Sequence, residues 1–287
     1  MSIKLENINC TYMPKTPFEK AALYDINIEI EKGEFVGIIG HTGSGKSTLL
    51  QHFNGLIMPD KKSTGKVYID GELLTKKNVR DLRKKVGYVF QYPEYQLFEE
   101  TVYKDIAFGL KKLKLSEQEE YEAIHNAAEI VGISDDLLER SVYDLSGGQK
   151  RRVAIAGVIV MNPDYLILDE PAAGLDPAGK DEILTFAKRL RDERGTAVVL
   201  VSHSMEDIAQ ISDRVIVMNE GRIVMDGKPS YVFAQKKELN DIGLSVPEIT
   251  SLFCRLNEQY PWISKEVYTV QDAVNVMKKL LSGGAVK

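Results

Sequence analysis

The sequence is poor in cysteine and has no long apolar run. Only Cys10 and Cys254 occur among 287 residues, too few for a disulfide framework, so we expect a reducing, cytosolic setting. The first six residues contain no apolar signal core. The longest apolar run, Val153 to Met161, is too short to cross a bilayer. If the protein acts at a membrane, it must therefore dock there through a partner.

An excess of positive charge is also missing. The chain has 37 Lys and Arg against 42 Asp and Glu, a net charge of -5 at pH 7. Because a nucleic-acid-binding domain is usually basic, we expect no nucleic-acid partner. The length suffices for one large domain or two.

A glycine-rich segment carries the first functional signal. Residues Gly40 to Ser47 read G-H-T-G-S-G-K-S and fit the phosphate-loop pattern G-x-x-x-x-G-K-[ST]. The apolar stretch Phe35 to Ile39 precedes the loop and a helical segment follows it, which is the required order. We expect Lys46 to contact the β- and γ-phosphates of a nucleotide and the Ser47 hydroxyl to bind Mg²⁺. The nucleotide-binding residues predicted here are Gly40, His41, Thr42, Gly43, Ser44, Gly45, Lys46, Ser47 and Thr48.

Two carboxylates end a second apolar segment, Leu166 to Glu170. A strand ending beside the phosphate loop would let Asp169 hold Mg²⁺ through water. Glu170 comes one residue closer to the γ-phosphate, and we expect it to act as the general base that polarises the attacking water. This interpretation depends on the spacing of the pair from the phosphate loop and on the apolar residues directly before it. An isolated Asp-Glu pair more often marks an acidic turn.

A second helix start suited to a phosphate reads L-S-G-G-Q, from Leu145 to Gln149. Ser146 is predicted to cap the helix over residues 150–161, and the two glycines let the backbone approach an anion. The basic residues expected to add positive charge at this helix end are Lys150, Arg151 and Arg152.

Strands and helices alternate along much of the chain, which indicates an α/β fold with a mainly parallel sheet. Strands are expected over Val86–Phe90 and Ala197–Val201, and a hairpin over residues 214–225. Residues from about 92 to 161 read as helical, with a capping box at Ser116 and Glu119. The strands stop near residue 230, and helices are expected around 246–260 and 270–281.

The order of G-H-T-G-S-G-K-S, L-S-G-G-Q and L-I-L-D-E-P resembles the nucleotide-binding subunits of ATP-binding-cassette (ABC) transporters. The resemblance covers roughly residues 3–233. It implies a P-loop NTPase fold with an antiparallel β subdomain and a helical subdomain at about 92–161. In that family L-S-G-G-Q contacts the γ-phosphate of ATP held by the opposite subunit's phosphate loop. It therefore implies a head-to-tail dimer around two ATP molecules, with trans contacts from Ser146, Gly147, Gly148 and Gln149.

The same resemblance implies roles for three further residues. Gln91, after the strand Val86–Phe90, matches the family's Q-loop and would reach Mg²⁺ and the attacking water. His203 matches the switch histidine, which contacts the γ-phosphate and orients Glu170. Tyr12 lies where the family keeps an aromatic residue that stacks on adenine.

The stretch Q-Y-P-E-Y-Q-L-F-E-E-T-V, residues 91–102, resembles ATPases of energy-coupling-factor (ECF) transporters, as does the His41-Thr42 variant of the phosphate loop. ECF transporters import vitamins, or cobalt and nickel ions, into prokaryotic cells. The likeness implies a homo- or heterodimer with a second ABC ATPase, a transmembrane coupling subunit and a substrate-binding membrane subunit. It places the protein peripherally at the cytoplasmic face of the membrane, with a small helical dimerisation region at 234–287.

An apolar helix of a membrane partner would contact Tyr95, Leu97 and Phe98, unless these side chains fill the core of the helical subdomain. Two other functions stay open at this point. One is the ATPase of a conventional ABC importer with a soluble binding protein, which the stretch 92–109 disfavours. The other is a non-transport ABC ATPase, which usually has a long coiled-coil insertion or two cassettes in tandem.

Overall fold

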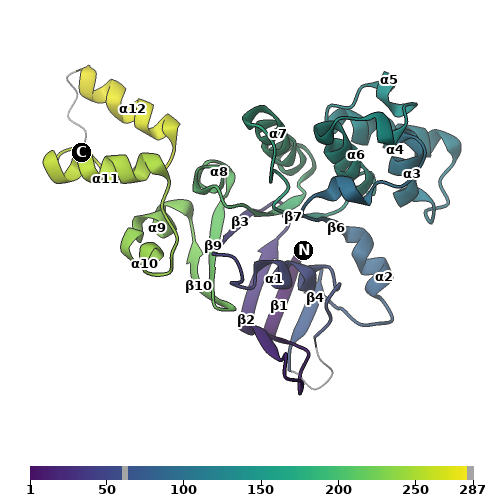
Figure 1. Cartoon of the computed structure of the whole chain (residues 1–287), viewed down its shortest axis with the longest axis horizontal. Helices are drawn as coiled ribbons and strands as arrows, with labels where there is room; N and C mark the ends of the chain where they lie inside the picture. The colour runs from purple at the N-terminus through teal and green to yellow at the C-terminus, as the bar shows by residue number, and fades with distance from the viewer. Residues whose placement is uncertain (60–63, 283–287) are drawn as a thin grey trace.

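The computed structural model describes residues 1–59 and 64–282 of the chain. Within these residues the strands form two sheets (Figure 1). The antiparallel sheet has the order β2 (Lys20–Glu31), β1 (Ser2–Tyr12), β4 (Lys66–Ile69) and β5 (Glu72–Leu73). The second sheet has the order β10 (Arg222–Gly227), β9 (Arg214–Asn219), β3 (Phe35–Ile39), β8 (Ala197–Val201), β7 (Tyr165–Asp169) and β6 (Val86–Val89). Its neighbours run parallel except the β9–β10 hairpin, so the predicted fold class is confirmed.

The central strands are apolar, except for Asp169 at the end of β7, because both faces of the larger sheet are covered. Strands β3, β7 and β8 are buried at every position. Their alternate side chains enter two separate cores, since successive residues of a strand point to opposite faces. In β8, for example, Val198 and Leu200 pack in one core, and Val199 and Val201 in the other.

The chain between β6 and β7 is helical and lies at one end of the molecule (Figure 1). Its elements are η2 (Pro93–Gln96), α3 (Val102–Ala107), η3 (Phe108–Leu110), α4 (Glu117–Ile130), α5 (Asp135–Leu138), η4 (Val142–Asp144) and α6 (Gly147–Ile159). Ser116 caps α4 in a capping box with Glu119, as predicted. Ser146 caps α6 in the same way with Gln149. Helix α6 therefore begins three residues before the predicted start.

The remaining helices follow the strands of the two sheets. They are α1 (Lys46–Phe53), α2 (Val79–Leu82), η1 (Arg83–Lys85), α7 (Pro177–Arg194), α8 (Met205–Ile211), α9 (Pro229–Ala234), α10 (Lys236–Asp241), α11 (Glu248–Gln259) and α12 (Val270–Leu281). Helix α7 starts at Pro177, because the Asp176 side chain accepts the Gly179 N–H and a proline occupies the first turn. Helix α12 has the predicted bounds.

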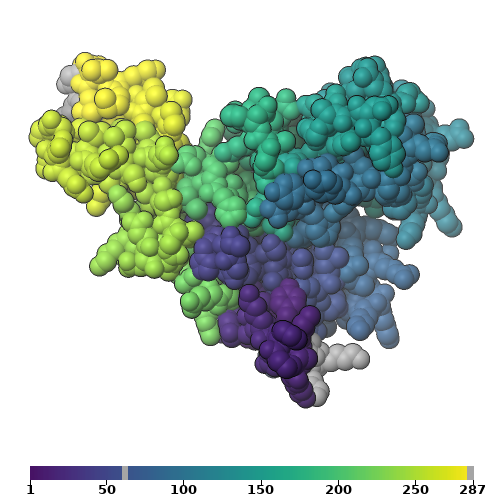
Figure 2. Space-filling view, in the orientation of Figure 1, coloured from purple at the N-terminus to yellow at the C-terminus, as the bar shows by residue number. Residues whose placement is uncertain are grey.

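The last two helices, α11 and α12, protrude at the end of the molecule opposite the helical segment 93–159 (Figures 1 and 2). They share a small core formed by Phe253, Ile263, Val267 and Ala273. Residues 283–287 of the predicted region 234–287 lie outside the described residues. Over the described part of the chain, every helix is too short or too polar to cross a membrane.

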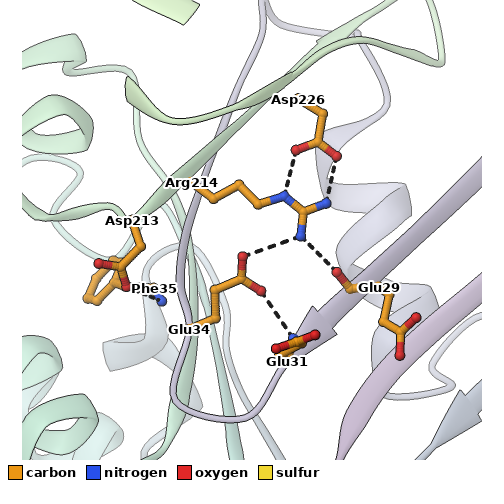
Figure 3. A network of polar contacts seen from close by, with 7 residues as sticks. All are labelled: Glu29, Glu31, Glu34, Phe35, Asp213, Arg214 and Asp226. Carbon is orange, nitrogen blue, oxygen red and sulfur yellow. Dashed lines mark hydrogen bonds and ion pairs between the residues drawn. The ribbon is translucent and has the colours of Figure 1, made fainter. Parts of the chain in front are cut away.

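An arginine on β9 ties the two sheets together beside β3 (Figure 3). Arg214 donates two hydrogen bonds to Asp226 of β10, at 2.5 and 2.6 Å, and one to the Glu29 carbonyl of β2, at 2.9 Å. The adjacent Asp213 accepts the backbone N–H of Phe35, the first residue of β3, at 3.0 Å. These contacts fix β3, and with it the loop that follows, against both sheets.

Candidate nucleotide site

The predicted site residues follow the carboxyl ends of neighbouring parallel strands, where open α/β sheets bind ligands. The phosphate loop follows β3, Gln91 comes two residues after β6, Glu170 follows β7, and His203 comes two residues after β8. Because β3, β8, β7 and β6 are adjacent in that order, residues separated by more than a hundred positions meet at one edge.

The loop between β3 and α1 has the backbone that a phosphate cradle requires. Gly43 and Gly45 have φ angles of 84° and 104°, a region that disfavours other residues. The ammonium of Lys46 donates to the carbonyls of Gly40 and His41, at 2.7 and 3.1 Å, and the residue as a whole is 6% exposed. Burial lowers the pKa of Lys46, against the attraction of nearby carboxylates. The loop is thus curled around a single cationic group.

A cavity of about 440 Å³ opens beside this loop. The predicted residues that line it are Tyr12, Thr42, Gly43, Gly45, Lys46, Ser47, Thr48, Gln91, Glu170 and His203. Sequence reasoning missed three further lining residues at the start of β2, which are Lys20, Ala21 and Ala22. They carry no motif, and only the pairing of β1 with β2 brings them to the cavity.

The Glu170 carboxylate is held from both sides. Its Oε2 accepts a hydrogen bond from the Gln91 amide at 2.9 Å, and its Oε1 lies 2.8 Å from Nε2 of His203. The Glu170 backbone has a φ of 52°, unusual for a residue other than glycine. Gln91 and His203, predicted from the family resemblance, therefore meet at the residue predicted to be the base.

Asp169 lies behind Glu170 and is buried. Its two oxygens accept hydrogen bonds from the hydroxyls of Tyr88, at 3.0 Å, and Ser47, at 3.4 Å. Burial raises the pKa of Asp169 above its ordinary value, although both hydrogen bonds oppose the rise. Hard oxygen ligands of this kind suit Mg²⁺, so the Ser47–Asp169 pair fits the metal that the sequence predicts. Tyr88 had no sequence signal.

Of the predicted loop residues, Gly40, His41 and Ser44 do not line the cavity. The His41 ring bonds to Asn219 and to the Thr42 carbonyl, and the Ser44 side chain is fully buried. Tyr12 lies at the rim, half exposed, with its hydroxyl 3.1 Å from that of Thr48.

The segment Ser146 to Gln149 lies apart from this cavity, at the start of α6. Ser146, Gly147 and Gly148 are exposed. Of the three basic residues expected to add positive charge at this helix end, the two arginines do not. Arg151 is buried and paired with Glu94, and Arg152 is paired with Glu182, at 2.6 Å each.

Comparison with known proteins places this site in a family. The sequence profile described as "ABC transporter" matches residues 23–173. A Clostridium perfringens protein named energy-coupling factor transporter ATP-binding protein EcfA2 is 54% identical over 98% of this chain and 99% of its own length. A protein of the same name from Caldanaerobacter subterraneus subsp. tengcongensis is 55% identical over 99% of both chains. The chain belongs to the ABC transporter family, among its energy-coupling factor ATP-binding proteins.

Solved structures of ABC ATPases share the fold. CbiO1 from Clostridium perfringens, described as part of the ABC transporter complex cbiONQ, is 40% identical with a TM-score of 0.74, over 87% of this chain and 97% of that one. The cassette MJ0796, in a dimeric post-hydrolysis state bound to ADP and Pi, is 29% identical with a TM-score of 0.70, over 79% of this chain and 98% of that one. This ABC ATPase accordingly binds and hydrolyses ATP.

Proposed function

We propose that this ABC ATPase drives an ECF importer, coupling ATP binding and hydrolysis to the uptake of a vitamin or of a cobalt or nickel ion. The near full-length similarity to energy-coupling factor ATP-binding proteins supports the transporter class. The protein would lie at the cytoplasmic face of the membrane, bound to a transmembrane coupling subunit and a substrate-binding membrane subunit. The transported substrate would meet those subunits and not this chain.

The Glu170 carboxylate, fixed between Gln91 and His203 at the cavity wall, carries the catalytic part of the proposal. Its position fits a general base that polarises the attacking water, an effect worth about 10²–10⁴-fold. His203 would contact the γ-phosphate and keep Glu170 oriented, and Gln91 would reach the same water. A base held by two hydrogen bonds needs little rearrangement before reaction.

The phosphate loop would bind the triphosphate through its backbone N–H groups and Lys46. The nucleotide-binding set is Tyr12, Gln91 and the residues Gly40, His41, Thr42, Gly43, Ser44, Gly45, Lys46, Ser47 and Thr48. Ser47, Gln91 and Asp169 would hold Mg²⁺, with Asp169 acting through water. When bound, Mg²⁺ neutralises charge on the β- and γ-phosphates. Tyr12, exposed at the rim of the cavity, would stack on adenine.

The exposed start of α6 supports a dimer in which each ATP touches two chains. Ser146, Gly147, Gly148 and Gln149 would contact the γ-phosphate held by the partner's loop, because a helix N-terminus with free N–H groups attracts an anion. Residues 3–233 would form the ATPase domain, with a helical subdomain at about 92–161. The region 234–287 would help to hold the dimer.

The helical end of the molecule offers a surface for the membrane partner. Tyr95 is 85% exposed, and Phe98 lies beside the exposed Phe108 with their rings 4.8 Å apart. Exposed aromatic clusters commonly mark interaction sites. Leu97 packs partly against the core, so we assign contact with the partner's apolar helix chiefly to Tyr95 and Phe98.

The proposal is tested with the complex recovered from membranes and reconstituted in vesicles. We expect Glu170→Gln to lower ATP turnover by about 10²-fold or more, to abolish uptake, and to keep ATP binding in a closed dimer. The matched control Glu193→Gln, on the exposed face of α7, should hydrolyse and transport normally. Unchanged turnover in Glu170→Gln would reject the catalytic assignment. Recovery of the chain with ribosomes or DNA and without membrane subunits would reject the transport function.

A further inference from the structure

One buried arginine joins three segments around the nucleotide site. Arg151, in the second turn of α6, is 4% exposed. Its guanidinium donates to both carboxylate oxygens of Glu94, at 3.0 and 2.6 Å. It also donates to the carbonyls of Pro171 and Ala173, at 3.2 and 2.6 Å. The planar fork of arginine can satisfy these acceptors together, whereas a lysine ammonium presents only a compact point charge.

The first anchored segment carries Gln91. Glu94 lies in η2, three residues after Gln91, and its side chain is largely buried. Burial would raise the pKa of Glu94, but the hydrogen bonds and positive charge of Arg151 outweigh it and hold the pKa below its ordinary value. Tyr92, between the two residues, has a φ of 54° and its ring lies 5.8 Å from the guanidinium. The backbone here is strained and is held in place by this contact.

The second anchored segment carries Glu170. Pro171 and Ala173 follow it directly, and the Ala173 N–H donates to the Glu170 carbonyl at 3.1 Å. Glu170 has the second strained backbone of the pair, with a φ of 52°. Strained backbone therefore lies at Glu170 itself and at Tyr92, next to Gln91, and Arg151 binds the chain just after each of these two residues.

The third segment is α6 itself, whose first residues are the predicted trans contact to the partner's nucleotide. Arg151 lies five residues after Ser146 on the same continuous helix. A displacement of the helix start is therefore carried rigidly to Arg151, because a hydrogen-bonded helix moves as a unit.

We propose that Arg151 is a positioning residue that couples the two nucleotide sites of the dimer. When α6 docks on the partner's ATP, Arg151 carries segments 91–94 and 170–173 into the arrangement in which Gln91 and Glu170 act on this chain's own ATP. The inference rests on the role proposed above for Glu170. It adds a route by which occupation of one site sets the alignment of the other.

The experiment compares Arg151→Met and Glu94→Gln with the unmodified full chain, in the ATPase assembly that hydrolyses ATP. We expect kcat to fall about 10- to 100-fold in each variant, because misplacement of catalytic groups by about 1 Å has effects of that size. KM for ATP should change less than about threefold, since the phosphate loop is untouched. The double variant should lose no more activity than Arg151→Met alone, because both changes remove the same Arg151–Glu94 contact. Arg140→Met, an exposed ion-paired arginine of the same helical segment, is the matched control and should keep kcat.

The result that overturns the proposal is a kcat, per folded chain, within about twofold of the unmodified value in Glu94→Gln or Arg151→Met. A rise in KM that accounts for the whole loss, or additive losses in the double variant, would also overturn it. Thermal unfolding gives the folded fraction, and Glu94→Gln decides the question if Arg151→Met does not fold. Failure of the Glu170 assignment is recognised separately, by normal turnover in Glu170→Gln. Failure of this inference alone shows as an inactive Glu170→Gln beside active Arg151→Met and Glu94→Gln.

Discussion

Replacing Gly45 by alanine tests how far the phosphate loop depends on its contact with β2. An added Cβ would lie 2.7 Å from the Ala22 carbonyl oxygen and 3.0 Å from a methyl of Leu23. Ordinary contact begins at 3.4 Å, so the loop must move by about 0.7 Å. Phosphate hydrogen bonds near 2.9 Å would then stretch to about 3.6 Å and be lost.

Each lost hydrogen bond to a charged group is worth about 1.5–3 kcal/mol. Loss of one or two such bonds, about 1.5–6 kcal/mol in all, predicts a Kd for ATP that rises about 10- to 10⁴-fold in Gly45→Ala. The left-handed φ of 104° adds a folding cost of about 1–2 kcal/mol. Gly132→Ala is the matched control, because Gly132 has a φ of 69° but no atom within 4 Å of an added Cβ.

The assay is nucleotide binding by titration calorimetry, with thermal unfolding measured alongside. Both variants should lose stability, but only Gly45→Ala should lose ATP affinity. An affinity within about twofold of the unmodified chain in Gly45→Ala would refute the reasoning, because the loop would then have absorbed the clash without moving its donors.

Two further predictions concern the buried carboxylate and the signature helix. Because burial raises the pKa of Asp169, the contribution of this group to the free energy of unfolding falls as pH rises from the ordinary pKa to the raised one. Asp169→Asn should therefore raise the melting temperature of the nucleotide-free chain at pH 7 while stopping turnover. Asp70→Asn should lower the melting temperature instead, because Lys85 and Tyr165 hold the pKa of Asp70 low despite its burial. Melting temperatures that shift in the same direction in the two variants would contradict this reasoning. Ser146→Ala removes the cap that accepts the Gln149 N–H, at a cost of about 1 kcal/mol of stability. The variant should associate more weakly with ATP in sedimentation velocity, while ATP binding by the single chain persists. Unchanged association would contradict the contact between Ser146 and the partner's nucleotide.

Local signals made much of the fold predictable from the sequence. The strands Phe35–Ile39 and Ala197–Val201 have the predicted bounds, because short apolar runs beside glycine turns leave little choice. The capping boxes at Ser116 and Ser146 formed because both partners of each lie within four residues. Local signals also mark the start of α7, where Asp176 caps the helix and a proline follows it.

Longer-range features escaped prediction. Helices α9 and α10 are only six residues each, too short for a periodic pattern to stand out. The first half of β2 has no clean alternation, so Lys20 to Ala22 were not placed at the cavity. The Arg151–Glu94 pair spans 57 positions, and sequence alone assigned that charge to the signature helix end instead. Pairings of this kind exist only once the sheet has brought its strand ends together.

The central claim is that each ATP is held between the phosphate loop of one chain and the signature residues of another. The most direct measurement is a structure of Glu170→Gln in the presence of Mg²⁺ and ATP, determined for the ATPase assembly. The account predicts that Lys46 of one chain and the segment Ser146–Gly148 of a second ATPase chain both contact the same γ-phosphate. A nucleotide bound by one chain alone, with that segment of every chain facing solvent, would contradict it.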